Sequence, residues 1–461
     1  MIYRFLVLMF IFFTFSLPDI NGQKKPEDTT SLLHYFKKGK TEGHFRLYYM
    51  STNNDEYLTD YYALAFGGGL KYQTKSFKGF QAGVGGFFIW NLSSSDLTKP
   101  DPYTNISNRY EIGQFDQANP ANKKDLQRLE DFFIKYSFRN AFFKYGKQVI
   151  KTPFINPQDG RMRPTGEQGF WSEVNEIKKT KLEFGFITQI SPRGTTRWYR
   201  GASSIGIYPS GVAISGLKSD YKYNLKSKGI GIVGINYSLT KEIKFQLWEY
   251  WVENIFNTLF LQVEGSFPIS KTEKLIAGVQ YVHQDPINKG GNTDPSKTYF
   301  DPTQQVNIVS ARTGIQFKTT ALKFNYSRIT KDGRFLFPRE WGREPLYTFL
   351  PRERNEGAGD VNAFTVNFLK NLFDKKFIAE AGFGYFSLPD VNDARLNKYS
   401  FPSYYQLNID LKYAFQGFLE GLNTEILYVY KKNNGNIYNN LKNVINKTNM
   451  HQFNIIVNYN F

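Results

Sequence analysis

From about residue 43 to the end of the chain, apolar residues alternate with polar or small residues in segments of roughly ten positions. In the clearest segment, 406–415, the polar residues occupy even positions and the odd positions are Leu407, Ile409, Leu411, Tyr413 and Phe415. Such alternation places one set of side chains on each face of a β-strand. A soluble sheet shows the same alternation, so the connections between segments must decide the class of protein.

Short and long connections alternate almost strictly between these segments. The short turns lie at 139–140, 178–181, 240–242, 270–274, 319–320, 374–376 and 416–421. The long connections are rich in Pro, Gly, Asn and charge, and span about 95–125, 151–169, 192–226, 286–303, 331–359, 388–402 and 433–449. This arrangement is typical of transmembrane barrels. We therefore predict an all-β fold, a transmembrane antiparallel β-barrel of about 18 strands with a water-filled interior.

The two ends of the repeating region are expected to meet. The last strand carries Phe453, Ile455, Val457, Tyr459 and the terminal Phe461 on one face. Exported outer-membrane barrels typically present such a terminal aromatic residue to the machinery that inserts them. Because lipid forbids open sheet edges, we expect this strand to pair with the first one, 43–52.

Composition and charge exclude several other classes. The sequence has 43 Phe and 31 Tyr, too many for a disordered chain, and no Cys, which excludes a disulfide scaffold. A mean hydropathy of −0.46 excludes a bundle of membrane helices. The net charge of +17 could indicate nucleic acid, but the cations are scattered over strands, turns and loops. We expect no nucleic-acid partner and contacts with lipid headgroup phosphates instead.

The N-terminus indicates export. Arg4 precedes an apolar run, residues 5–17, and a polar stretch follows at 18–22. The run is short for a membrane span, which needs about 20 residues, so we predict a secretory signal peptide at residues 1–22. A short periplasmic segment, 23–42, and one barrel domain, 43–461, complete the predicted organisation. The predicted location is the outer membrane of a Gram-negative bacterium.

The sequence offers little for catalysis. His283 is the only histidine close to an acid, Asp285, at a strand end, and no nucleophile-elbow or zinc-protease motif accompanies it. The glycine-rich runs 67–69 and 83–86 are not followed by the Lys-Ser/Thr pair of a phosphate loop. We expect a protein that is not an enzyme and uses no cofactor and no metal.

Two segments resemble a known family. Residues 333–345 read Gly-Arg-Phe-Leu-Phe-Pro-Arg-Glu-Trp-Gly-Arg-Glu-Pro, and 351–357 read Pro-Arg-Glu-Arg-Asn-Glu-Gly. Residues 144–148 read Lys-Tyr-Gly-Lys-Gln, and 152–164 read Thr-Pro-Phe-Ile-Asn-Pro-Gln-Asp-Gly-Arg-Met-Arg-Pro. These stretches are similar to segments of the OprD family of outer-membrane porins. The resemblance implies an 18-stranded channel whose third and seventh outer loops fold inward and form a constriction lined by basic residues. Such porins take up small solutes that often carry a carboxylate.

Strand parity predicts which charges face the interior. The cations Arg46, Lys135, Lys144, Arg312 and Lys323 lie opposite the apolar set, as do the acids Glu183, Glu264, Glu380, Asp410 and Glu425. A basic wall would concentrate anions in a low-dielectric tube. Alternatively, the two signs pair with each other and merely solvate the interior.

The long connections carry the remaining candidate cations. In the 151–169 connection, Gly160 and the flanking prolines are expected to hold Arg161 and Arg163 in a constriction. Arginine suits this position because its planar fork binds a carboxylate with two hydrogen bonds. In the 331–359 connection, Arg334, Arg339, Arg343, Arg352 and Arg354 alternate with Glu340, Glu344, Glu353 and Glu356. We expect some of these pairs to stiffen the loop and one or two of the arginines to meet the solute.

The predicted function is therefore a substrate-selective passive channel for small solutes, with an anionic or carboxylate-bearing group favoured. Its expected partners are outer-membrane lipid and lipopolysaccharide, the solute, and the barrel-insertion machinery during export. A barrel whose outer loops bind a partner, as an adhesin or receptor, is the alternative. Conductance after reconstitution in a bilayer distinguishes the two.

Overall fold

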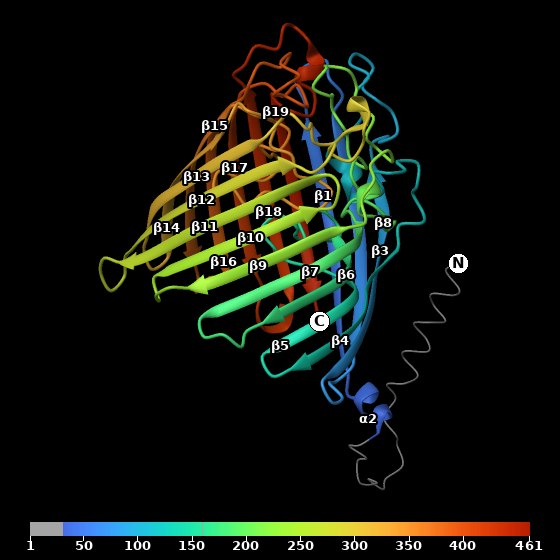
Figure 1. Cartoon of the computed structure of the whole chain (residues 1–461), viewed down its shortest axis with the longest axis vertical. Coiled ribbons are helices and arrows are strands. Elements are labelled where there is room, and N and C mark those ends of the chain that lie inside the picture. Colours follow the sequence, from blue (N-terminus) through green and yellow to red (C-terminus); the bar gives the residue numbers. More distant parts are fainter. Residues whose placement is uncertain (1–30, 159) are drawn as a thin grey trace.

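The computed structural model describes residues 31–158 and 160–461, and the predicted signal peptide lies outside this part of the chain. The described chain forms one closed antiparallel barrel (Figure 1). Of its 19 strands, the two-residue β8 pairs only with the end of β7, which leaves 18 strands around the barrel. The predicted fold class and strand number are confirmed.

The strands are β1 (Lys40–Asn53), β2 (Tyr61–Gln73), β3 (Phe80–Ser94), β4 (Arg128–Phe138), β5 (Ala141–Gln148), β6 (Gly166–Val174), β7 (Thr180–Ser191), β8 (Tyr199–Arg200), β9 (Ile230–Ser238), β10 (Ile243–Val252), β11 (Phe256–Pro268), β12 (Lys274–Pro286), β13 (Val306–Gln316), β14 (Thr320–Ile329), β15 (Val361–Leu372), β16 (Phe377–Ser387), β17 (Tyr404–Ala414), β18 (Leu422–Asn433) and β19 (Met450–Asn460). Helical segments are few: α2 (Leu32–Lys37) and the 3₁₀ turns Glu111–Gln114, Ala202–Ser204, Pro295–Lys297, Gly417–Leu419 and Leu441–Asn443. No helix in the described part of the chain is long and apolar enough to cross a membrane.

Pairing of the first and last strands closes the barrel, as predicted. In β1, Phe45 lies opposite Tyr459 of β19 on one side and opposite Gly68 of β2 on the other. The strand begins at Lys40, earlier than the boundary drawn at residue 43, because Lys40 pairs with Gln73 of β2.

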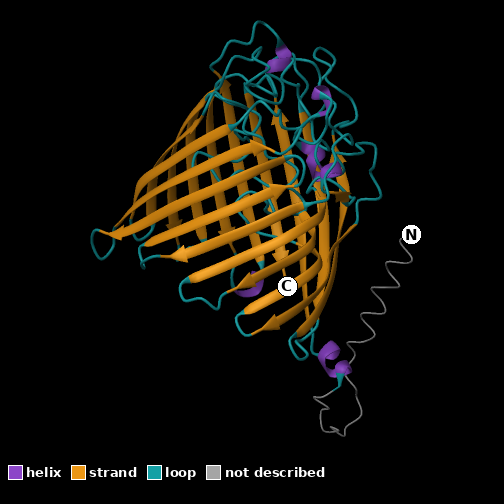
Figure 2. Ribbon diagram, viewed as in Figure 1, coloured by secondary structure: helices purple, strands orange, loops and turns teal. Residues whose placement is uncertain are grey.

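Long loops gather at one end of the barrel and short turns at the other (Figure 2). Counted from the N-terminus, the loops used below are loop 2 (95–127), loop 3 (149–165), loop 4 (192–229), loop 7 (330–360), loop 8 (388–403) and loop 9 (434–449). The predicted alternation fails at residues 253–255, which connect β10 and β11 at the long-loop end, and the β1–β2 connection at that end, residues 54–60, is also short. Residues 166–169, expected in a loop, belong to β6 because they pair with β5 and β7 despite their two glycines.

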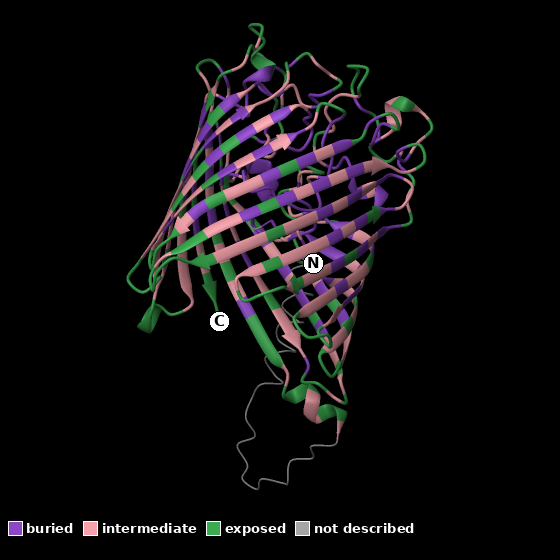
Figure 3. Ribbon diagram, turned by 60° about the vertical axis from the view of Figure 1, so that its left-hand side comes forward, coloured by how far each residue is buried: buried purple, intermediate pink, exposed green. Residues whose placement is uncertain are grey.

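The two faces of the wall differ as the alternation predicts. Large apolar side chains on the outer face are exposed, for example Phe132 (61 %) and Ile134 (63 %) on β4, while Phe133 between them is buried. Buried residues gather toward the long-loop end (Figure 3), where loop residues such as Phe154 and Trp341 join the wall residues Tyr250 and Phe256 in one core. The interior is therefore filled by loops at this end, and an apolar outer surface remains for lipid.

Candidate functional site

Loop 3 lies inside the barrel. The Phe154 ring packs against inward-facing Tyr250 and Phe260, with ring centroids 5.5 and 5.8 Å away. It also stacks on Phe337 of loop 7 at 4.7 Å. Because a buried aromatic side chain contributes a large apolar area, these contacts fix loop 3 against the wall and against loop 7.

Loop 7 crosses the interior and is hydrogen-bonded to several strands. Gln280 of β12 donates to the Pro345 carbonyl at 3.0 Å, and Gln406 of β17 donates to the Pro351 carbonyl at 2.8 Å. Asn408, also on β17, donates to the same Pro351 carbonyl at 3.1 Å. Loops 3 and 7 both fold inward, as the resemblance implied.

Four arginines meet at Gln158 and Gly160 of loop 3, and we call Arg161, Arg193, Arg352 and Arg354 the arginine cluster. Arg193 of loop 4 donates to the Gln158 carbonyl at 2.9 Å, and Arg354 of loop 7 donates to the Gln158 side chain. Arg161 donates to the Gly160 carbonyl at 2.6 Å, and Arg352 points at the same carbonyl at 3.4 Å.

Gly160 allows this convergence. A Cβ built at this position would lie 3.0 Å from Nη1 of Arg352 and 3.3 Å from Nη1 of Arg193. The missing side chain therefore leaves room for two guanidinium groups to approach the loop backbone.

The cluster has no carboxylate counter-ion among the described residues: none of its four members forms an ion pair there. Asp159 lies outside the described residues. Burial, followed by repulsion from Arg352, lowers the pKa of Arg161 to about 10, and burial and Arg161 lower the pKa of Arg193. Repulsion between neighbouring cations raises the free energy of the arginine cluster, and a bound anion would relieve it.

The four glutamates of loop 7 are used elsewhere. Glu340 accepts backbone N–H bonds from Gly206 and Tyr208 of loop 4, and Glu344 accepts them from Asn355 and Glu356. Glu353 and Glu356 are engaged in ion pairs, and all four acids are at most 5 % exposed. The carboxylates of the loop therefore hold its fold together, and the cluster keeps its positive charge.

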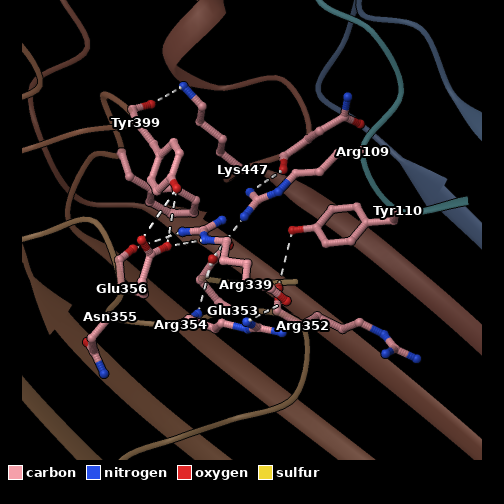
Figure 4. Close-up of polar contacts among 12 residues, drawn as sticks. Arg109, Tyr110, Arg339, Arg352, Glu353, Arg354, Asn355, Glu356, Tyr399 and Lys447 are labelled. Atoms are coloured by element: carbon pink, nitrogen blue, oxygen red, sulfur yellow. Dashed lines mark hydrogen bonds and ion pairs between the residues drawn. The ribbon is translucent and has the colours of Figure 1, made fainter. Parts of the chain in front are cut away.

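Buried ion pairs connect loop 7 to its neighbours (Figure 4). Glu353 pairs with Arg109 of loop 2 and Lys431 of β18, each at 3.0 Å. Burial alone would raise the pKa of Glu353, but the charges of Arg109, Lys431 and Arg339 hold it well below its usual range. Arg339 pairs with Glu356 at 2.5 Å and lies over the Tyr399 ring. We call Arg109, Arg339, Glu353, Glu356 and Lys431 the ion-pair network.

The predicted wall cations face inward, but several are paired or packed. Arg46 donates to the Arg161 carbonyl at 2.6 Å, directly beside the cluster. Arg312 pairs with Glu264 at 3.8 Å and lies over the Tyr347 ring of loop 7. Lys144 lies over the Phe133 ring at 3.8 Å. Lys323 shares the inward face of β14 with Asn325.

The inward acids also face the interior, and most of them have cationic partners. Glu183 pairs with Lys181 at 2.8 Å, and Asp410 and Glu380 both pair with Lys412, at 2.7 and 3.5 Å. On the barrel wall, Arg312 and these acids therefore pair with charges of opposite sign, which fits the alternative of paired charges better than that of a basic wall. The excess positive charge lies in the loops.

Four predicted loop arginines lie outside the cluster. Arg163 is 1 % exposed, packs toward the Phe87 ring and donates to the Leu126 carbonyl. Arg334 is buried and donates to the Val212 carbonyl of loop 4 at 2.6 Å. Arg339 belongs to the ion-pair network, and Arg343 is exposed and lies over Phe349. Arg163 and Arg334 are thus placed to join loops rather than to meet a solute.

Sequence reasoning missed Arg193, Arg109 and Lys431. Arg193 lies between Pro192 and Gly194, the same setting that singled out Arg161, and could have been found by that signal. Arg109 and Lys431 gave no signal, because their role depends on Glu353, which is more than 70 residues away from Lys431 in the chain. In the described part of the chain, no group of three or more His, Asp or Glu could hold a metal ion.

Comparisons with known proteins agree with this geometry. The sequence model described as outer membrane porin, OprD family, matches residues 109–355. Comparison with curated protein sequences gives no significant match.

Several solved structures share the fold. Acinetobacter baumannii OccAB2 superposes with a TM-score of 0.71 at 14 % identity, covering 93 % of this chain and 98 % of that one. Pseudomonas aeruginosa OccD3 (OpdP) gives 0.70 at 13 % identity, covering 96 % and 99 %. Pseudomonas aeruginosa OpdK, solved with vanillate, gives 0.68 at 14 % identity, covering 93 % and 99 %.

Proposed function

This chain belongs to the OprD family of outer-membrane porins of Gram-negative bacteria, and from that premise we propose that it is a passive uptake channel selective for small anionic or carboxylate-bearing solutes. The observation that carries the proposal is the arginine cluster. Arg161, Arg193, Arg352 and Arg354 converge on one short segment of loop 3 inside the barrel and have no carboxylate partner among the described residues.

The chemistry of the cluster favours a carboxylate over a simple halide. A guanidinium group presents parallel N–H donors that match the two oxygens of a carboxylate. Its charge also persists at neutral pH, since the pKa of Arg161 stays at about 10. Cations from loops 3, 4 and 7 surround the same backbone carbonyls, so a solute passing them would exchange water for several donors in turn.

A related structure supports the solute class. OpdK, which shares the fold, was solved with vanillate, an aromatic molecule that carries one carboxylate. By analogy, an aromatic carboxylate is the first solute to test on this chain.

The route to the membrane belongs to the same proposal. We infer that residues 1–22 direct export and that the terminal Phe461, whose side chain is 56 % exposed, is read by the barrel-insertion machinery. We also infer that the 23–42 segment is periplasmic, because α2 and the start of β1 lie at the short-turn end of the barrel (Figure 1). Deleting Phe461 should lower the yield of folded protein in the outer membrane.

The direct test is electrical. Purified protein reconstituted in a planar bilayer should give a reversal potential of the sign for anion preference in a salt gradient. Benzoate should block the current at lower concentration than benzamide, which has the same ring and no charge. Equal block by both molecules would contradict the proposal. Inserted protein without conductance would favour the adhesin or receptor alternative.

A further inference from the structure

A row of polar side chains crosses the outer, lipid-facing surface of the barrel near its extracellular rim. Lys147 of β5 lies opposite Gln168 of β6, Gln168 lies opposite Gln189 of β7, and Gln189 lies opposite Arg200 of β8. Directly opposed residues of antiparallel strands point to the same face. All four side chains of the row therefore point to the same face of the barrel wall.

The neighbour of Lys147 identifies that side. Phe132 of β4 lies opposite Lys147 and is 61 % exposed on the outer face. Lys147 and Arg200 thus point away from the channel. Neither residue belongs to the arginine cluster, and neither takes part in the proposed solute path.

A rung of large apolar side chains lies directly below the row. One rung closer to the periplasm, Ile134, Tyr145, Phe170 and Phe186 are paired across the same strands. Ile134 and Tyr145 are 63 % and 65 % exposed, as expected for side chains in lipid. Two residues of strand span about 7 Å, so the two cations lie about 7 Å closer to the extracellular end than this apolar rung. That is the level expected for lipid headgroups.

Trp198 of loop 4 completes the arrangement. Its ring lies 3.7 Å from Nζ of Lys147, and its indole N–H donates to the Leu129 carbonyl of β4 at 3.1 Å. Lys147 also donates to Gln168 at 2.9 Å. Tryptophan is enriched where acyl chains meet headgroups, and here it holds the lysine at that level. These two contacts fix the position of the Lys147 ammonium group.

Charge on this part of the rim is uncompensated. Among the ion pairs within residues 31–158 and 160–461, none includes Lys147 or Arg200. Elsewhere on the outer face, by contrast, Arg328 pairs with Asp360 at 2.5 Å. The cation on β14 is therefore compensated, whereas those on β5 and β8 are not.

We propose that Lys147, Arg200 and Trp198 form a binding site for the phosphorylated headgroup of an outer-leaflet glycolipid, with the two cations, three strands apart, meeting different phosphates. Two cations at headgroup depth, spaced by amides that can donate further hydrogen bonds, fit a phosphorylated glycolipid whose acyl chains lie on Tyr145 and Phe186. The site would anchor the β5–β8 side of the barrel to the leaflet. It is independent of which solute the channel passes.

The test compares lipid retention by three proteins in detergent, read by native mass spectrometry: wild type, Lys147→Gln/Arg200→Gln, and Arg328→Gln as a matched control from the compensated side. The probe is lipid A, a bisphosphorylated glycolipid. Each cation lost near a charged membrane surface should lower affinity about fivefold, so the double variant should bind about 25-fold more weakly. The control should bind as the wild type does.

Three further readings make the result decisive. Both variants should conduct as the wild type does, which separates failure of this site from failure of the proposed solute selectivity. Inorganic phosphate should compete weakly, because it lacks the acyl chains; competition as strong as that of lipid A would mean a small-anion site and overturn the proposal. Equal binding of dephosphorylated lipid A, or undiminished binding by the folded double variant, would also overturn it.

Discussion

Within loop 7, adjacent glutamates and arginines have different environments. Glu353 and Glu356 are buried in the ion-pair network, whereas Arg352 and Arg354 donate to Gly160 and Gln158 of loop 3. Because the four glutamates of the loop accept hydrogen bonds or pair with cations outside the arginine cluster, none of them forms an ion pair with the cluster. The same charge-rich sequence thus builds a rigid scaffold and leaves a positive site on it.

The largest effect should come from breaking the ion-pair network. Glu353→Gln leaves Arg109 and Lys431 without their shared carboxylate, and Lys431 is fully buried. Removing one partner of a buried pair typically costs about 3–5 kcal/mol. We expect a lower midpoint in urea unfolding and a larger, noisier single-channel conductance as loop 7 loosens. Glu273→Gln, at an exposed periplasmic turn, is the control. Unchanged stability of Glu353→Gln would show that the network is not a scaffold.

A smaller effect is expected from pH. Burial raises the pKa of Glu344 to about 7, although hydrogen bonds from Asn355 oppose the shift. The carboxyl is therefore neutral below about pH 7 and negative above it, so it begins to offset the charge of nearby Arg354 as pH rises. Anion preference should fall roughly twofold between about pH 6 and 8. Glu344→Gln should abolish this dependence, and a variant that keeps it would refute the assignment to Glu344.

The smallest effect should come from Arg163. The sequence alone placed Arg163 beside Arg161 in the constriction, but its side chain is buried toward Phe87 and donates to the Leu126 carbonyl. Two of its nitrogens, Nε and Nη1, lack a partner in the described structure, so neutralising it removes little. Arg163→Gln should leave the reversal potential unchanged and shift stability by about 1 kcal/mol or less. A loss of anion preference in Arg163→Gln would contradict this prediction and show that Arg163 contributes to the solute path.

The sequence predicted features that depend on local patterns better than features that depend on contacts between distant residues. Alternation and turn signals are local, so the strand number, the approximate positions of the long loops and the inward parity of Arg46, Lys144, Arg312 and Lys323 could be derived from them. Which arginine of a loop meets the passage depends on long-range packing. Arg161 and Arg163 differ by two positions, yet one lies beside Arg352 and the other against β3.

The central claim is that the arginine cluster sets the selectivity. The most direct measurement is the reversal potential at low salt for wild type, Arg352→Gln and Arg395→Gln, the last an exposed loop 8 arginine outside the cluster. A unit charge at about 7 Å and an effective dielectric of about 40 contributes about 1.2 kcal/mol. The anion-to-cation permeability ratio should therefore fall about five- to tenfold in Arg352→Gln and stay at the wild-type value in Arg395→Gln. An unchanged ratio in Arg352→Gln, or the same fall in both variants, would contradict the account.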